Sequence, residues 1–206
     1  MTSSTSITGG SCDITDATAG TWNVVVTNTD TGTDSLVDGF TVTSSSYSLR
    51  DIGPAGGYIF YINPNYATDG WRYLEAAPSA GDTTTIKWSN ITTAIGTTGT
   101  AIGTGKTNTE AILAQAGFTD GAAKNCDNFS VNGYDDWFLP SQGELELMYD
   151  NLRLYSVGNF SIVSPASYWS SSEVSATNAY RHKFDSDIQD SVGKTSPYKY
   201  RPVRRF

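Results

Sequence analysis

Tyr168–Phe206 reads YWSSSEVSATNAYRHKFDSDIQDSVGKTSPYKYRPVRRF, and this C-terminal stretch, here the tail segment, decides how the rest of the chain is interpreted. Its ends are rich in aromatic residues, whereas its middle is almost wholly polar and has neither helical nor strict strand periodicity. We expect the large residues at its two ends to lie in a core, namely Tyr168, Trp169, Val203 and Phe206. The polar middle would then face a partner, because scattered polar and aromatic side chains are typical of adaptable recognition surfaces. The tail segment therefore favours binding over catalysis.

Composition bounds the fold and the partners. With 206 residues, of which 12% are aromatic and only 17% charged, the chain is long enough to bury a core and favours a strand-rich, loop-rich fold. The net charge of -8 argues against nucleic acid as a partner, because phosphate neutralisation needs a basic face. No apolar run is long enough for a transmembrane segment, and the N-terminus lacks the pattern of a signal peptide. The composition is nonetheless typical of extracellular proteins, so we expect the targeting signal to lie upstream of Met1.

The N-terminal part predicts a small β segment. Residues 7–42 read ITGGSCDITDATAGTWNVVVTNTDTGTDSLVDGFTV, with alternation from Thr21 to Thr27, a turn at residues 29–32 and a return that ends at Val42. This pattern predicts antiparallel strands joined by a tight turn.

The same stretch resembles the closing hairpin of an IPT/TIG immunoglobulin-like domain. A sandwich of that class needs about seven strands, and only about three can be found here. We therefore expect residues 1–46 to form a partial immunoglobulin-like β segment that acts as a spacer, and residues 47–206 to form a separate ligand-binding domain after a Ser-rich joint.

Strand signals open this second domain. A short apolar run at Tyr58–Ile62 predicts a buried strand, and Trp71–Ala76 predicts a second strand before Pro78. Residues 81–105 are rich in Thr, Gly and Ser around Trp88 and predict loops with short strands.

Helix signals follow. Thr107–Glu110, ahead of an apolar stretch, predicts a capped helix that ends near Gln115, and residues 121–128 predict a short helix. Ser141 and Glu144 form a capping-box pattern. The helix after it has one apolar face made by Leu145, Met148, Tyr149 and Leu152, which we expect in the core.

Gly103–Thr107 reads GTGKT and invites interpretation as a phosphate-binding loop. A P-loop needs a glycine five positions before the glycine of its Gly-Lys pair, and Thr100 occupies that position. The spacing therefore argues against nucleotide binding.

Six motifs in order carry a resemblance to a known family: GPAGGYIFY, GWRYLEAAP, AIGTGKTNTEAI, NGYDDWFLPSQGELELMY, YWSSSE and YRPVRRF. Over roughly residues 50–206 the chain resembles the C-terminal domain of Lcl-type bacterial surface adhesins. The resemblance implies a C-type lectin-like fold, with two helices beside small twisted sheets and the chain's end returning to a central strand. The expected fold class is therefore α+β, a C-type lectin-like domain preceded by the partial immunoglobulin-like segment.

The resemblance also implies a location and a ligand class. Members occur on bacterial surfaces, in lipoproteins and in phage-associated proteins, so we expect an extracellular protein on a cell surface or virion. They bind host or environmental ligands, and glycosaminoglycans are bound by the founding adhesin.

The tail segment by itself resembles the variable region of proteins diversified by retroelements, which mutagenise adenines in selected codons. The resemblance implies these candidate ligand-binding residues: Asn178, Tyr180, His182, Asp185, Asp187, Gln189, Asp190, Ser191, Thr195, Tyr198 and Lys199. The family commonly has glycine a few residues after the Phe, where this chain has Asp187. Asp187 is either a diversified position or the sign of a different local turn.

Two kinds of ligand stay open. Arg181, Lys183 and Lys199 leave room for a sulfated glycan bound with fixed specificity, whereas the aromatic content fits a protein ligand better. A homo-oligomer also stays open.

Calcium-dependent sugar binding is disfavoured, and we expect no cofactor. Ca²⁺ needs six to eight oxygen ligands. C-type lectins that bind sugars use Glu-Pro-Asn or Gln-Pro-Asp together with Trp-Asn-Asp. This chain has only Asn63-Pro64-Asn65 and Trp88-Ser89-Asn90, and neither matches.

An enzyme is the weakest interpretation. His182 is the only histidine, so a triad or a histidine-based metal site would rest on one residue of the polar tail segment. Formylglycine-generating oxidases share the lectin-like fold but use a pair of cysteines, and we expect Cys12 and Cys126 to be unpaired thiols in different domains. Asp135 and Asp136 could serve as catalytic carboxylates, yet turn and capping roles explain them equally well.

Overall fold

The computed structural model describes residues 20–27, 33–42, 46–79 and 84–206. The chain divides into two compact units, Met1–Ser46 and Tyr47–Phe206. In the first unit, β1 (Gly20–Thr27) pairs antiparallel with β2 (Thr33–Val42), with a register shift between Trp22 and Val24. The predicted antiparallel pair is confirmed, while its turn and Cys12 lie outside the described residues.

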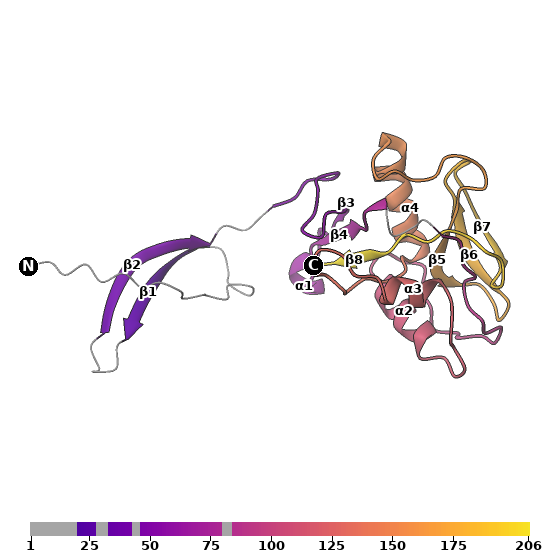
Figure 1. The fold of residues 1–206 in the computed structure, drawn as a ribbon, viewed down its shortest axis with the longest axis horizontal. Helices are drawn as coiled ribbons and strands as arrows, with labels where there is room; N and C mark the ends of the chain where they lie inside the picture. The colour runs from indigo at the N-terminus through magenta and orange to yellow at the C-terminus, as the bar shows by residue number, and fades with distance from the viewer. Residues whose placement is uncertain (1–19, 28–32, 43–45, 80–83) are drawn as a thin grey trace, which may run out of the picture. The chain divides into compact units, whose positions relative to one another are not determined.

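The second unit contains two three-stranded antiparallel sheets (Figure 1). The first sheet has the order β3 (Tyr58–Ile62), β4 (Tyr73–Ala76), β8 (Val203–Arg205). The second has the order β5 (Ser167–Glu173), β6 (Asn178–Lys183), β7 (Ile188–Gly193). The helical elements are α1 (Tyr66–Asp69), α2 (Gly105–Leu113), α3 (Ala122–Asp127), α4 (Gln142–Asn151) and the 3₁₀ helix η2 (Arg153–Tyr155). This mixture of helices and sheets is the expected α+β class.

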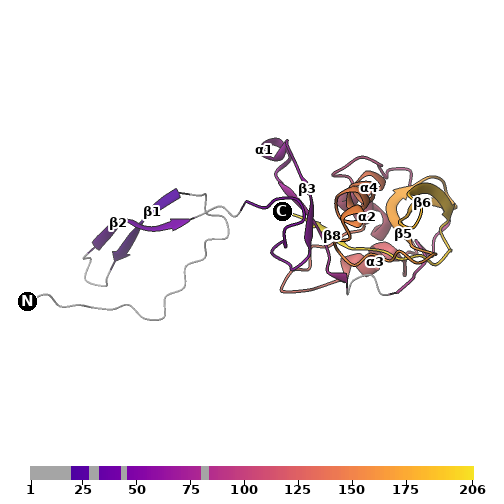
Figure 2. The same ribbon diagram turned by 90° about the horizontal axis from the view of Figure 1, so that it is seen from above.

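Helix α4 lies between the two sheets and contacts β3, β5 and β6 (Figure 2). Its predicted capping box is confirmed: Ser141 Oγ accepts from the Glu144 amide at 3.2 Å, and the Glu144 carboxylate accepts from the Ser141 amide at 2.7 Å. The predicted apolar face is buried in a core that both sheets share. The cap and the face therefore fix the position of α4 from its own sequence.

The predicted cap of α2 is wrong. The helix begins at Gly105, two residues before Thr107, and Thr104 precedes it without a side-chain cap. The Gly103 amide instead donates to the Glu144 carboxylate at 2.8 Å. The stretch that suggests a phosphate loop thus binds an anion of the chain itself.

The middle of the tail segment, whose sequence has no strict strand periodicity, forms the strands β6 and β7. Both faces of β6 carry a buried residue, Ala179 on one and His182 on the other. Simple apolar alternation is therefore absent although the strand is regular.

The end of the chain closes the first sheet. Val203 pairs with Ala76 in β4, and its backbone also exchanges hydrogen bonds of 2.8 and 2.9 Å with Phe138. Buried Arg204 donates to Asp136 at 2.8 Å and to Glu75 at 3.3 Å. Carboxylates inside the fold therefore neutralise part of the positive charge of the tail segment.

No helix in the described ranges is long and apolar enough to cross a membrane.

Candidate ligand-binding surface

Burial divides the tail segment into two classes of residue. Of the eleven candidate residues, ten are half-buried or exposed, and only His182 is buried, with 1% of its surface exposed. Other residues of the tail segment are fully buried, among them Tyr168, Trp169, Ala179, Phe184, Lys194 and Val203. Phe206, expected in the core, is half-buried. Buried residues thus hold a segment whose other side chains reach solvent.

The candidate residues lie on both faces of the second sheet. Strand register puts Tyr180 opposite Ser191 and His182 opposite Gln189, on the face that packs against α4. There the His182 ring lies 4.8 Å from the Tyr149 ring, and Gln189 accepts a hydrogen bond from Gln142.

The opposite face carries the charged residues. Arg181 donates to Asp190 at 2.7 and 3.3 Å, and Lys183 lies 2.6 Å from the same carboxylate. Tyr198 packs edge-to-face on Trp169 with ring centroids 5.2 Å apart, and the Arg181 guanidinium lies 4.3 Å from the centre of the Tyr198 ring. The Arg181 hydrogen bond is the main cause that holds the pKa of Asp190 below its ordinary value. The eleven residues therefore do not form one patch.

The turn between β6 and β7 explains the aspartate found in place of glycine. Asp187 has a φ of +54°, in the left-handed region that Gly, Asn and Asp tolerate best. Its carboxylate lies 3.0 Å from His182 Nε2. Burial lowers the pKa of His182, and the nearby Asp187 carboxylate partly opposes that shift. Asp185 and Asp187 are both exposed.

Thr195 and Lys199, like Tyr198, lie beyond β7. Thr195 is exposed in a turn, whereas Lys199 is half-buried. The Lys199 backbone pairs with β5, because its carbonyl accepts from Trp169 at 2.8 Å and its amide donates to Ser167 at 3.0 Å.

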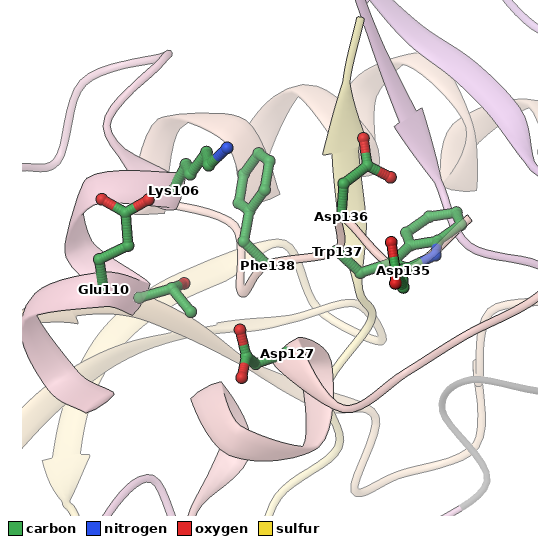
Figure 3. Close-up of a pocket in the computed structure, with 8 residues that line it drawn as sticks. Lys106, Glu110, Asp127, Asp135, Asp136, Trp137 and Phe138 are labelled. Atoms are coloured by element: carbon green, nitrogen blue, oxygen red, sulfur yellow. The ribbon is translucent and has the colours of Figure 1, made fainter. Parts of the chain in front are cut away.

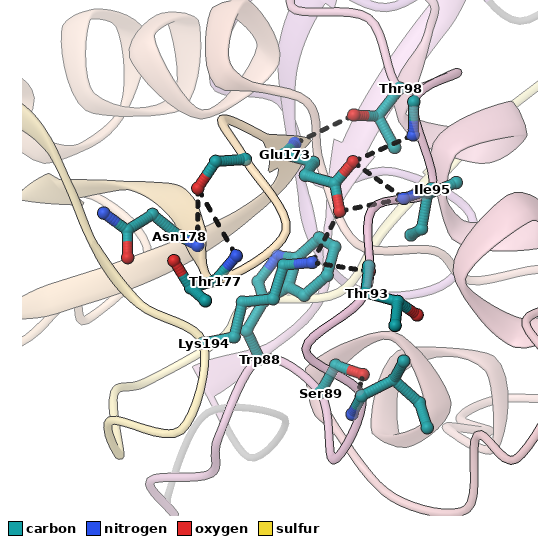
Figure 4. A network of polar contacts seen from close by, with 12 residues as sticks. Trp88, Ser89, Thr93, Ile95, Thr98, Glu173, Thr177, Asn178 and Lys194 are labelled. Carbon is teal, nitrogen blue, oxygen red and sulfur yellow. Dashed lines mark hydrogen bonds and ion pairs between the residues drawn. The ribbon is translucent and has the colours of Figure 1, made fainter.

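A buried ion pair joins the end of β5 to the residue after β7 (Figure 4). Lys194 donates to Glu173 at 2.5 Å and lies 4.8 Å from the centre of the Trp88 ring. The same carboxylate accepts from the amides of Ile95 and Gly96 at 2.9 Å. No local sequence pattern indicates this pair, because Glu173 and Lys194 lie 21 residues apart.

Residues 79–204 match the Lcl C-terminal domain family. The chain belongs to that family. The match covers more than half of the chain and begins after the two motifs that form β3 and β4. None of the curated proteins matches the chain.

The Lcl C-terminal domain also has a cavity of about 190 Å³ beside β8, and none of the eleven candidate residues lines it (Figure 3). It is lined by Lys106, Thr109, Glu110, Asp127, Asp135, Asp136, Trp137 and Phe138. Asp136 is paired with Arg204. Within the described ranges, no three His, Cys, Asp or Glu side chains are grouped so as to hold a metal ion.

The stretches compared with calcium-binding motifs have structural roles in the second unit. Asn63 donates to Asp69 at 2.9 Å and accepts from the Asn65 amide at 2.9 Å, which shapes the turn into α1. Asn90 accepts from the amides of Thr119 and Asp120 at 2.9 and 3.2 Å. Both amide groups are therefore used within the fold.

Proposed function

We propose that this Lcl C-terminal domain is a ligand-binding module of a protein displayed on a bacterial surface or virion, and that it contacts its ligand through the tail segment. The observation that carries the proposal is the division of that segment into fully buried residues and surface-reaching candidate residues. A rigid scaffold that carries variable surface residues is a common division of labour in recognition proteins. The two small sheets beside α2 and α4, with the chain's end returning beside β4, support a C-type lectin-like fold.

A protein ligand is favoured over a sulfated glycan. Recognition of sulfates needs cations with free donors, and Asp190 already pairs with both Arg181 and Lys183. Exposed Ser191 and half-buried Tyr180 instead offer aromatic area beside small polar groups, as in paratopes. Heparin affinity chromatography checks this: we expect elution below about 0.15 M salt, where charges separated by more than about 8 Å are screened. Retention above that concentration would favour the glycan adhesin.

We also propose that the domain is not an enzyme. The Cys126 side chain is fully buried, and burial raises the pKa of its thiol well above the ordinary value, so it is a poor nucleophile. His182 lies in the core between Tyr149 and Phe184 and is held by Asp187. These environments stabilise the fold rather than expose a reactive group.

The more specific form of the proposal is that a retroelement diversifies the tail segment. It requires that the surface-reaching candidates tolerate substitution whereas the buried residues do not, and a display library tests this requirement. The whole chain is displayed on yeast with the ten surface-reaching candidates randomised, and a control library randomises buried Tyr168, Trp169, Ala179 and Phe184. We expect most clones of the first library to fold, as judged by protease resistance, and few of the second. Position 187 should return mainly Gly, Asn and Asp, because of its positive φ. Equal loss of folding in both libraries would refute the proposed display surface.

A genomic test addresses diversification itself. We expect a near-copy of the Tyr168–Phe206 coding stretch near this gene, with mismatches at adenines, beside a reverse transcriptase gene. Absence of that copy, together with a tolerant library, would leave a ligand-binding surface of fixed specificity.

A further inference from the structure

The segment after α4 combines exposed apolar side chains with a cavity. Four of the nine exposed large apolar residues in the described ranges fall within ten positions: Leu154, Tyr155, Ile162 and Val163, with 57 to 77% of their surfaces exposed. The cavity beside them measures about 210 Å³ and is lined by Arg153, Ser156, Val157, Asn159, Phe160 and Ile162. None of the eleven candidate residues of the tail segment lines it. Clustered exposed apolar side chains mark interaction sites in soluble proteins.

Hydrogen bonds and a stacking contact fix the loop that forms the cavity wall. Arg201 is fully buried and donates to the carbonyls of Gly158 at 2.9 Å and Ala77 at 3.0 Å. Its guanidinium stacks on the Phe160 ring at 4.1 Å. The Ser161 amide donates to the Tyr168 hydroxyl at 2.8 Å, which fixes the far end of the loop. The site is therefore formed before any ligand arrives, which limits the ordering entropy that binding must overcome.

Arg153 gives the cavity its charge. It is half-buried, and its side chain has no hydrogen bond or ion pair within the described part of the chain. Its Nε is buried without an acceptor. A second cation lies nearby, because the Arg50 guanidinium stacks 4.1 Å over the ring of Tyr155, two residues after Arg153. By contrast, Arg181 and Arg204 each bind a carboxylate of the chain.

We propose that this cavity, the η2 site, binds a peptide segment of another protein that presents an apolar side chain next to a carboxylate. The apolar chain fills the space between Val157, Phe160 and Ile162, and the carboxylate pairs with Arg153. A second copy of this chain is the less suitable occupant, because a net charge of -8 on each copy opposes self-association. None of the eleven candidate residues lines the η2 site, so a failure of this proposal leaves the proposed function untouched, and the reverse also holds.

A matched pair of small probes tests the chemistry. N-acetyl-phenylalanine carries an aromatic ring and a carboxylate, and N-acetyl-phenylalaninamide has the same ring without the charge. Each is titrated into the ¹⁵N-labelled full chain while amide shifts are followed. We expect saturable shifts for residues 153–163 with the acid at millimolar Kd. The amide should bind at least tenfold more weakly, because it cannot form a charge-assisted hydrogen bond with Arg153. Equal affinities, or shifts confined to other regions, would overturn the proposal.

Variants locate the site and identify the occupant. Arg153→Met should abolish the preference for the acid with an unchanged Tm, whereas Arg72→Met, at another arginine without an ion pair, should preserve it. Ile162→Ser should weaken both probes about equally. Sedimentation of the wild-type chain and of the Ile162→Ser variant completes the test. A wild-type dimer that the substitution dissociates would identify a second copy of the chain, not a foreign peptide, as the occupant.

Discussion

Lys194 and Glu173 form a buried ion pair that joins the end of β5 to the residue after β7 and to the loop at Ile95. We predict that Lys194→Met strongly destabilises the second unit. The Lys194 side chain is fully buried and that of Glu173 is 5% exposed, so the carboxylate left behind could not be solvated without opening the structure. The two backbone amides that Glu173 accepts from would compensate only part of the lost charge.

The expected magnitude follows from burial. Removing one partner of a buried ion pair costs about 3 to 5 kcal/mol. The amides of Ile95 and Gly96 favour the lower end of that range. For a domain of this size, about 1 kcal/mol shifts Tm by about 2 to 4 °C, so Lys194→Met should lower Tm by about 6 to 12 °C.

Calorimetry on a double-mutant cycle provides the assay. Lys194→Met, Glu173→Gln and the double variant are compared, and the double variant should cost clearly less than the sum of the single variants. Lys87 and Asp120, 3.1 Å apart but 34 and 49% exposed, supply a matched surface pair. Lys87→Met should cost less than about 1 kcal/mol. If Lys194→Met were no more destabilising than Lys87→Met, the reasoning from burial would be refuted.

The same pair predicts a pH dependence. Burial raises the pKa of Glu173, but the Gly96 amide, Lys194 and the Ile95 amide outweigh it and hold the pKa below its ordinary value of 4.5. Because the folded-state pKa is depressed, the stabilisation is fully present above the unfolded-state pKa and is lost as pH falls through the folded-state pKa. The stability gap between wild type and Glu173→Gln should therefore narrow steadily below pH 4.5. A gap that widens on acidification would contradict the assignment.

Three further predictions concern other buried positions. Gly105→Ala should destabilise the chain, because its Cβ would collide with the Glu144 carboxylate and lie 2.9 Å from the Ser141 amide nitrogen; Gly193→Ala, with no neighbour nearer than 3.9 Å, should shift Tm by less than about 2 °C. Trp169→Ala should cost about 3 to 5 kcal/mol, since the ring is fully buried and its Nε1 donates to Ile86 at 2.8 Å; an unchanged Tm would show that the ring is not in the core. His182, the only histidine, should have a pKa below 6.5 in an NMR titration, because burial disfavours its charged form. The free energy of unfolding should therefore fall as pH drops from about 6.5 towards the folded-state pKa of His182. A measured pKa at or above 6.5 would contradict this environment.

Local signals in the sequence determined several parts of this protein. The capping box and apolar face of α4 appear where Ser141, Glu144 and Leu145 predict them, because both depend on residues within two helical turns. The strand β3 is an apolar run. The ordered motifs identify the family, and the aromatic ends of the tail segment identify Tyr168 and Trp169 as core residues.

The tertiary structure alone decided which polar groups meet. Glu173 and Lys194 lie 21 residues apart, and Glu144 reaches the amide of Gly103 across 41 positions, so no local pattern reports either contact. Adjacent residues of a strand such as Tyr180 and Arg181 face opposite sides, but only the strand register pairs Asp190 with Arg181. Hydrogen bonds and ion pairs depend on separations of about 3 Å in space. Periodicity and composition describe neighbours along the chain, so the charge left free to meet a ligand is known only after the strands have paired.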